Sequence, residues 1–454
     1  LPIEHQVDKE LGPRARQVPI PEKRRLCRAY AEKFIDIQRR EFARLGVIGN
    51  WGDPYLTMAY AYEANIVREL GKFIATGSVY RGLKPVHWCI TCLTALAEAE
   101  VEYQDDPSPS IYVAFPLRSD ATALDPRLRD LPVSAVIWTT TPWTLPANLA
   151  IVVHPAEEYV VVRSGGAAYI VAAKLLDQTL RDCALADPEV LARVPGARLA
   201  GLVARHPWID RDAPLFPAEY VTMDQGTGLV HTAPGHGADD YETGIKHGLA
   251  VYNPVDDTGR FVPEVEHFAG MRVWEANPAI IAHLRANGRL LHASEFVHSY
   301  PHCWRCKNPV LFRATNQWFI SMERDGLRQR ALEAIRQVRW IPAWGEERIS
   351  GMIANRPDWC ISRQRAWGVP IAVFYCTACQ HLLAEPALLE HVARLVEQEG
   401  ADVWFARPAA ELLPAGTRCP QCGGAEFRKE KDILDVWFDS GVSHAAVLRA
   451  RADQ

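Results

Sequence analysis

Cysteine pairs are the residues of this sequence whose spacing most directly predicts chemistry. Of the eleven cysteines, eight form four Cys-x-x-Cys pairs, which are Cys89/Cys92, Cys303/Cys306, Cys376/Cys379 and Cys419/Cys422. Four thiolates complete one tetrahedral zinc site, so eight predict two Zn2+ ions. Disulfide frameworks are typical of small, dense secreted domains, and this chain is neither. The pairs therefore favour zinc knuckles in a reducing compartment over disulfides.

The order of the pairs along the chain suggests which of them share a metal. The third and fourth pairs are close enough for one small module, and Gly423 and Gly424 follow Cys422 as in a knuckle turn. By elimination, the first and second pairs share the other zinc and join the two ends of a long insertion. A single Cys-x-x-Cys can instead be a redox pair or two buried thiols.

A threonine-rich segment, Trp138–Asn148, follows an apolar strand and contains two prolines. Its threonines are Thr139, Thr140, Thr141 and Thr144. Hydroxyls gathered at a strand end can bind a ligand or position a water molecule. The pattern fits equally well a β-bulge capped by its own hydroxyls.

A glycine-rich segment, Gly226–Tyr241, brings two histidines and two aspartates onto a tight path; these are His231, His236, Asp239 and Asp240. A carboxylate there can hold an ammonium group, and a histidine can bond a hydroxyl or orient water. One alternative is a metal site made of His231, His236 and Asp240. The other is a structural loop in which Asp239 caps the next helix.

Two later segments combine charge with aromatic rings. Arg363 and Arg365 alternate with tryptophans in Asp358–Ile371, a pattern that suits phosphate contact with stacking. In Asp432–Gly441 a strand runs into a loop that carries Trp437 and Asp439. Strand ends in α/β folds are common ligand positions, although Trp437 could equally be a core anchor.

The overall composition is that of a globular chain. It has 454 residues, 48% hydrophobic and 23% charged, which predicts two to four domains and excludes disorder and collagen. No apolar run reaches the ~20 residues of a membrane span. With 50 basic and 55 acidic residues the net charge is −5, so a globally basic nucleic-acid coat is excluded. A basic stretch between Arg14 and Arg40 is either a local nucleic-acid patch or a solvated helix face.

Periodicity divides the chain into three parts. Helical spacing predicts helices over residues 22–45 and from Asp53-Pro54 to Gly77. From about residue 105 to 298 short β-branched runs separated by turns predict a β-barrel or β-rich domain with helices at 174–182 and after Asp239. We therefore predict an α/β domain made of residues 1–104 and 299–454, interrupted by residues 105–298, with a zinc module at 376–422.

These segments together resemble class I aminoacyl-tRNA synthetases, and most closely their isoleucyl branch. The matching stretches are Leu1–Glu4, Trp51–Leu56, Glu63–Asn65, Lys84–Cys92, Ala95–Tyr103, Trp138–Asn148, Gly226–Tyr241, His298–Phe319, Asp358–Pro370 and Asp435–Gly441. Valyl and leucyl members share the layout, but their threonine-rich strings differ from Thr141-Pro142-Trp143. A valyl- or leucyl-type chain is the alternative within the family.

The resemblance implies a Rossmann-type catalytic domain that activates isoleucine with ATP and Mg2+ and charges tRNA(Ile). It also implies an inserted β-barrel editing domain that hydrolyses mischarged valyl-tRNA. One methylene gives only about 1–3 kcal/mol of discrimination, a limit for which these synthetases are the standard example. A monomer in the cytoplasm is the corresponding expectation.

The resemblance also assigns roles to single residues. Asp240 would bind the substrate ammonium, His231 the terminal ribose, and Thr139, Thr140, Thr141 and Thr144 would line the editing pocket. Trp437 and Asp439 would belong to the synthetic site, and Arg363 and Arg365 to that site or to tRNA.

The family's HIGH and KMSKS signatures belong upstream and downstream of this sequence, so we expect an internal fragment that does not activate isoleucine by itself. A free-standing editing hydrolase and a zinc-ribbon tRNA-binding module without catalysis are the other hypotheses. The first would not need Trp437, and the second would not need Asp240.

Overall fold

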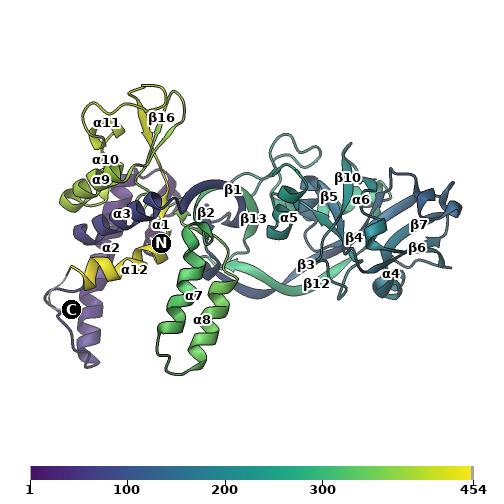
Figure 1. Cartoon of the computed structure of the whole chain (residues 1–454), viewed down its shortest axis with the longest axis horizontal. Helices are drawn as coiled ribbons and strands as arrows, with labels where there is room; N and C mark the ends of the chain where they lie inside the picture. Colours follow the sequence, from purple (N-terminus) through teal and green to yellow (C-terminus); the bar gives the residue numbers. More distant parts are fainter. Residues whose placement is uncertain (1, 451–454) are drawn as a thin grey trace. The chain divides into compact units, whose positions relative to one another are not determined.

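The computed structural model describes residues 2–450, so Leu1 of the first matching stretch and residues 451–454 lie outside the described part (Figure 1). The chain divides into two compact units. The first contains Leu1–Gly82, Thr94–Ala97 and Asn316–Gln454, and the second contains Leu83–Leu93 and Glu98–Thr315. The functional boundaries proposed from the sequence, at residues 105 and 298, stay predictions.

The second unit is built on two mixed sheets. The larger has the strand order β12 (Leu290–Cys303), β3 (Val101–Pro116), β4 (Val133–Thr139), β7 (Ala167–Ala172), β6 (Glu158–Ser164) and β8 (Glu189–Pro195). The smaller has the order β11 (Leu229–Thr232), β5 (Ala150–Val153), β10 (Asp212–Pro217) and β9 (Val203–Arg205). The β-rich prediction is therefore confirmed, as two sheets whose described pairings form no closed ring.

Valine and isoleucine side chains on both sheets form the core of this unit, as their β-branched shape favours. Three helices accompany the sheets: α4 (Leu176–Asp182), α5 (Ala238–Lys246) and α6 (Val273–Ala286). The first two agree with the predicted helices. The sequence reading did not include α6, because Pro278 stands inside it and normally marks a helix break. Strands β3 and β12 also extend beyond the sheet as a long two-stranded ribbon (Figure 1).

The first unit is mainly helical. Its helices are α1 (Pro2–Leu11), α2 (Ile20–Arg44), α3 (Tyr60–Ala75), α7 (Leu327–Gln337), α8 (Trp344–Ala354), α9 (Pro386–Glu399), α10 (Asp402–Ala406), α11 (Ala409–Leu412) and α12 (Val436–Gly441). One small sheet pairs β15 (Ser362–Arg363) with β19 (Ile433–Leu434). Another has the strand order β17 (Leu382–Leu383), β16 (Phe374–Cys376) and β18 (Phe427–Lys429). A further sheet has the order β14 (Trp359–Cys360), β13 (Leu311–Ile320), β1 (Val79–Cys89) and β2 (Thr94–Leu96). The mixed α/β class is as predicted, and no described helix has the length and apolar character to cross a membrane.

The second predicted helix starts later than expected. Asp53-Pro54 does not open it, because Ala59 keeps an extended backbone with φ −68° and ψ 137° at the N-cap of α3. The helix then buries an apolar stripe of Tyr62, Ile66 and Leu70, as helical spacing predicts. Gly71 of the same helix faces α9, where an added Cβ would make ordinary van der Waals contact with Leu389 at 3.6 Å.

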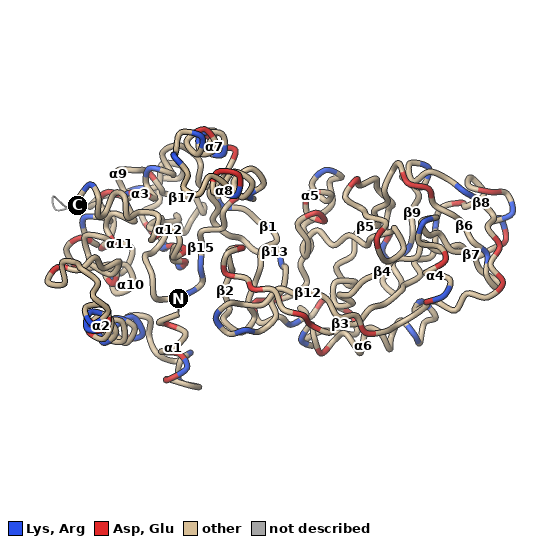
Figure 2. Tube along the Cα trace, turned by 90° about the horizontal axis from the view of Figure 1, so that it is seen from below, with Lys and Arg blue, Asp and Glu red and all other residues tan. Residues whose placement is uncertain are grey.

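The basic stretch around α2 is partly used inside the first unit. Figure 2 shows Lys and Arg along this helix. Arg24 is fully buried, pairs with Asp402 and donates to the Ala366 and Gly368 carbonyls. Lys23 pairs with Asp8 at 2.8 Å. These contacts favour a structural role for the inner face of the helix over a nucleic-acid patch.

A buried ion pair joins β15 to the start of α12. Arg363 Nη2 lies 3.1 Å from Asp435 Oδ2, and neither side chain is exposed. Trp359 Nε1 donates to the same oxygen at 2.8 Å, and Asp435 caps α12 by accepting the Trp437 N–H at 3.3 Å. One carboxylate therefore satisfies a cation, an indole and a helix end.

The substitution Asp435→Asn removes the carboxylate that neutralises Arg363 but keeps its shape. Breaking a buried pair in this way costs about 3–5 kcal/mol, so the free energy of unfolding from urea titrations should fall by about that amount. Glu399→Gln, which breaks the half-exposed pair with Arg407, should cost less than about 1 kcal/mol. Equal losses in the two variants would show that the buried pair has no special weight.

Candidate functional site

The threonine-rich and glycine-rich segments meet at one cavity of about 400 Å³ in the second unit. Its lining contains all six residues that the resemblance assigns to editing, namely Thr139, Thr140, Thr141, Thr144, His231 and Asp240. Strand β4 ends at Thr139, and β11 and the start of α5 supply the other side. Residues about 90 positions apart thus share one space, although their individual roles stay predictions.

A chain of hydroxyl contacts crosses the threonine segment. Thr139 Oγ1 lies 3.2 Å from Thr141 Oγ1, which lies 3.3 Å from Thr144 Oγ1. Thr144 Oγ1 is 3.0 Å from His231 Nε2. The hydroxyls bond one another, as the capped-turn interpretation expects, and they also line the cavity, as the ligand interpretation expects.

The threonine segment continues into a short 3-10 helix, Pro142–Ala147, whose backbone is held from outside. His206 Nε2 lies 2.8 Å from the Leu145 carbonyl oxygen, and Arg211 donates to the carbonyls of Pro146 and Asn148 at 3.0 and 2.9 Å. The Leu145 carbonyl also accepts the Asn148 N–H at 2.9 Å, whereas the Pro146 and Asn148 carbonyls receive their hydrogen bonds from Arg211.

A third residue holds the same helix from its other end. Asn277 of α6 accepts the Trp143 N–H at 3.0 Å. His206 Nδ1 accepts the N–H groups of Trp208 and Ile209, so its Nε2 carries the proton, and burial lowers its pKa to about 3. Sequence reasoning missed His206, Arg211 and Asn277 because no local pattern marks a side chain that bonds a distant backbone.

The glycine-rich loop places Asp240 in the first turn of α5. Asp240 Oδ2 accepts the Ala233 N–H at 2.8 Å, which ties the loop to its own helix. Two glycines allow this path. A Cβ at Gly237 would lie 2.9 Å from Asp240 Cγ, and one at Gly235 would lie 2.2 Å from the Tyr252 carbonyl oxygen.

The electrostatics of the cavity follow from burial. Burial raises the pKa of Asp240 to about 7, with the Ala233 N–H opposing that shift and Asp239 adding to it. Burial lowers the pKa of His231 and of His236 to about 4. Both histidines are therefore neutral at pH 7, and the cavity has no cationic histidine to attract an anion.

Two sequence hypotheses for this loop are wrong. Asp239 does not cap α5: the N-cap is Gly237, no side chain caps it, and Asp239 is exposed. The metal site of His231, His236 and Asp240 does not form either. Within residues 2–450, three or more metal-ligating atoms gather only at cysteines. Asp240 bonds the Ala233 N–H instead, and His236 Nδ1 bonds the Phe312 carbonyl at 2.9 Å.

The eight paired cysteines form two clusters, with the pairing expected from the sequence. In each cluster the four Sγ atoms lie within 4.8 Å of one another, and the members are Cys89, Cys92, Cys303 and Cys306, then Cys376, Cys379, Cys419 and Cys422. The Cys89–Cys306 and Cys376–Cys422 Sγ atoms are 3.5 Å apart. Thiolates around one zinc are about 3.8 Å apart for Zn–S bonds of about 2.3 Å, so both clusters fit zinc.

The residues expected at a synthetic site are not gathered in the same way. Arg363 is fully buried against Asp435, and Arg365 pairs with Glu4 at 3.4 Å and Asp8 at 2.8 Å. The charge of Arg363 is thus neutralised in the core, and the roles of both arginines at a synthetic site or toward tRNA stay predictions.

Trp437 and Asp439 lie on α12. Trp437 is 47% exposed, so it is not the core anchor of the alternative interpretation. Asp439 is a buried carboxyl whose pKa is well above its ordinary value, because of burial and the nearby Asp435. Their roles in a synthetic site stay predictions.

A family model described as tRNA synthetases class I (I, L, M and V) matches residues 1–454. The chain belongs to the class I tRNA synthetases. The resemblance inferred from the motifs is therefore confirmed.

Isoleucine–tRNA ligases are among the relatives of this synthetase chain. Those of Nitratidesulfovibrio vulgaris (strain Miyazaki F) and Geobacter sulfurreducens are each 55% identical over the whole chain and 49% of their own length. That of Moorella thermoacetica is 52% identical over the whole chain and 48% of its length. The chain thus spans about half the length of the curated relatives it matches. A cytosolic leucyl-tRNA synthetase editing domain from P. knowlesi aligns at 13% identity with a TM-score of 0.33, over 44% of this chain and 97% of that one.

Metal analysis tests the two cysteine clusters of the synthetase chain. Elemental analysis of the purified protein should find about two zinc ions per chain. Cys89→Ser should lose one of them and Cys376→Ser the other, while Cys183→Ser, outside both clusters, should lose neither. A wild-type chain with one zinc would contradict metal binding at one cluster, and the serine variants would identify which.

The raised pKa of Asp240 predicts a pH-dependent stability. Because its folded pKa of about 7 exceeds the ordinary 3.8, the folded state keeps a proton that the unfolded state releases. The resulting stabilisation is complete below pH 3.8 and is lost as the pH rises to about 7. Asp240→Asn cannot ionise, so between pH 5 and pH 8 the wild type should lose roughly 1–4 kcal/mol relative to it in urea unfolding. Parallel pH profiles would contradict the buried carboxyl.

Proposed function

We propose that this chain is part of an isoleucine–tRNA ligase whose parent activates isoleucine with ATP and Mg2+ and attaches it to tRNA(Ile). We further propose that residues 105–298 hydrolyse mischarged valyl-tRNA(Ile). The observation that carries this proposal is the 400 Å³ cavity, in which Asp240, four threonine hydroxyls and neutral His231 converge. The two cysteine clusters would hold structural zinc, and the parent would act in the cytoplasm as a monomer.

The proposed reaction is hydrolysis of the ester between valine and the terminal ribose. The Asp240 carboxylate binds the α-ammonium, and this ion pair in turn favours ionisation of a carboxyl whose pKa is otherwise about 7. Water adds to the ester carbonyl, the ester C–O bond breaks, and valine leaves with the water oxygen while the ribose oxygen takes a proton. The threonine hydroxyls position the water and exclude the larger isoleucine side chain.

The low pKa of His231 limits its role in this reaction. A histidine with a pKa of about 4 is a weak base at neutral pH, so it does not carry the water proton. Its Nε2 already contacts Thr144 Oγ1 at 3.0 Å, and the remaining polar atom, Nδ1, has no partner among the described residues. We assign it the positioning of the ribose hydroxyl, as the family resemblance suggests.

Deacylation of valyl-tRNA(Ile) by the purified chain tests the proposal, with isoleucyl-tRNA(Ile) hydrolysed more slowly. Asp240→Ala removes a charge-assisted contact worth about 1.5–3 kcal/mol, so the rate should fall roughly ten- to hundredfold. Asp239→Ala is the matched control: Asp239 also lines the cavity, but its side chain is exposed and caps no helix, so the rate should change less than about threefold. Equal effects from the two variants, or an unchanged rate in Asp240→Ala, would contradict the assignment.

A further inference from the structure

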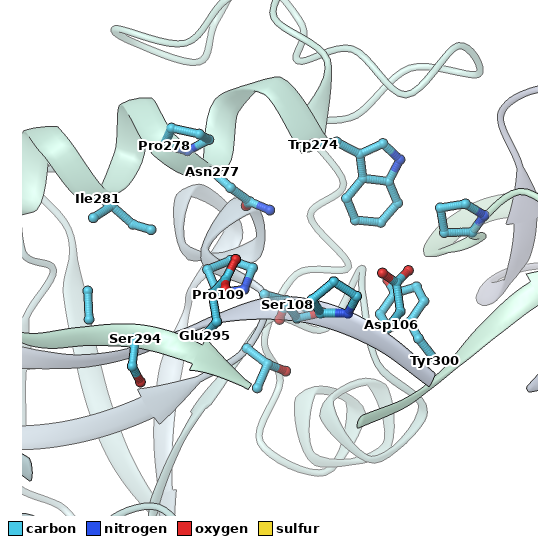
Figure 3. Close-up of a pocket in the computed structure, with 15 residues that line it drawn as sticks. Asp106, Ser108, Pro109, Trp274, Asn277, Pro278, Ile281, Ser294, Glu295 and Tyr300 are labelled. Atoms are coloured by element: carbon cyan, nitrogen blue, oxygen red, sulfur yellow. The ribbon is translucent and has the colours of Figure 1, made fainter. Parts of the chain in front are cut away.

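The second unit contains another cavity, of about 630 Å³ (Figure 3). Helix α6 contributes Trp274 and Asn277, and the β3–β12 ribbon contributes Asp106 and Glu295. Thr140 and Thr141 line both cavities. The second cavity therefore adjoins the proposed hydrolytic space at these two threonines.

The charged residues that line this second cavity are all acidic. Asp106 and Glu295 are carboxylates, and no lysine or arginine is among the lining residues. Asp106 lies 3.5 Å from His302 Nε2, whereas the Glu295 carboxylate has no hydrogen bond or ion pair within the described part of the chain. Such a lining favours a cation and disfavours phosphate or any other anion.

The uncharged lining offers three further kinds of contact. The rings of Trp274 and Tyr300 meet nearly at right angles with centroids 6.0 Å apart, which provides faces for an ammonium group. Asn277 uses Oδ1 to accept the Trp143 N–H, so its Nδ2 hydrogens remain for a carbonyl oxygen. Pro278 and Ile281 supply apolar surface for a branched side chain.

We propose that this second cavity binds the aminoacyl ester group of the mischarged tRNA before it enters the hydrolytic cavity. The inference rests on the proposed editing function. An aminoacyl ester has an ammonium group, a carbonyl and an aliphatic side chain, and each has a matching contact in the lining. A free amino acid adds a carboxylate, which Asp106 and Glu295 would repel, so the cavity selects the ester over its hydrolysis product.

Binding of L-valine methyl ester to the Asp240→Asn chain tests this site, because that variant lacks the ammonium contact of the first cavity. Ligand-observed NMR titration should detect the ester. Free L-valine, with its carboxylate, and methyl 3-methylbutanoate, without an ammonium group, should bind at least about tenfold more weakly. Equal binding of the ester and free valine would overturn the proposal.

Single substitutions locate the binding. In the Asp240→Asn background, Glu295→Gln and Asp106→Asn should each weaken ester binding about five- to tenfold. Glu264→Gln neutralises an exposed carboxylate outside both cavities and should change nothing. Glu295 has no partner to lose, so its variant should fold normally, and unchanged ester affinity in it would overturn the site.

Catalysis separates this proposal from the editing function itself. In a chain with native Asp240, Glu295→Gln should raise KM for valyl-tRNA without lowering kcat, because it destabilises only a complex that precedes the reacting complex. An unchanged KM would contradict the second cavity but not editing. A wild-type chain that binds the methyl ester through Glu295 and leaves valyl-tRNA intact would contradict editing but not the ester site.

Discussion

The hydrogen bond from the Ala233 N–H to the Asp240 carboxylate organises the candidate site. It closes the path from β11 into α5, along which a Cβ at Gly235 would collide with the Tyr252 carbonyl and one at Gly237 with the Asp240 side chain. It also keeps the carboxyl in a place where burial opposes its ionisation. A charge that is costly without a partner is well suited to hold an ammonium group, since the ligand then removes part of the cost.

The opposite wall of the cavity depends on a short 3-10 helix whose backbone is held by distant side chains. His206 and Arg211, from one turn, bond its carbonyl side, and Asn277, from α6, accepts its Trp143 N–H. Asn277 also lines the second cavity. The same amide therefore connects the position of the threonine hydroxyls with the lining of the proposed ester site, which gives the two cavities a shared support.

Each cysteine cluster brings together two Cys-x-x-Cys pairs that are separated in the sequence. One joins residues from β1 and its following turn to the end of β12 and its following turn, and these are far apart in the sequence. The other closes a module around β16. Loop closure over long separations is entropically unfavourable, so the proposed zinc at the first cluster would stabilise contacts that local structure does not provide.

The sequence by itself determined the chemistry that local spacing encodes. The Cys-x-x-Cys pairs, the apolar stripe of α3 and the glycine-rich approach to Asp240 were readable because each depends on neighbours within a few residues. The motifs together also identified the synthetase family. Only the tertiary structure decided which polar groups are neutralised inside: Arg363 meets Asp435 in the core, and Asp240 rather than Asp239 turns inward. Burial and partnering depend on residues brought together from distant positions. The sequence alone therefore does not show whether a charged residue faces water, a counter-charge or a substrate.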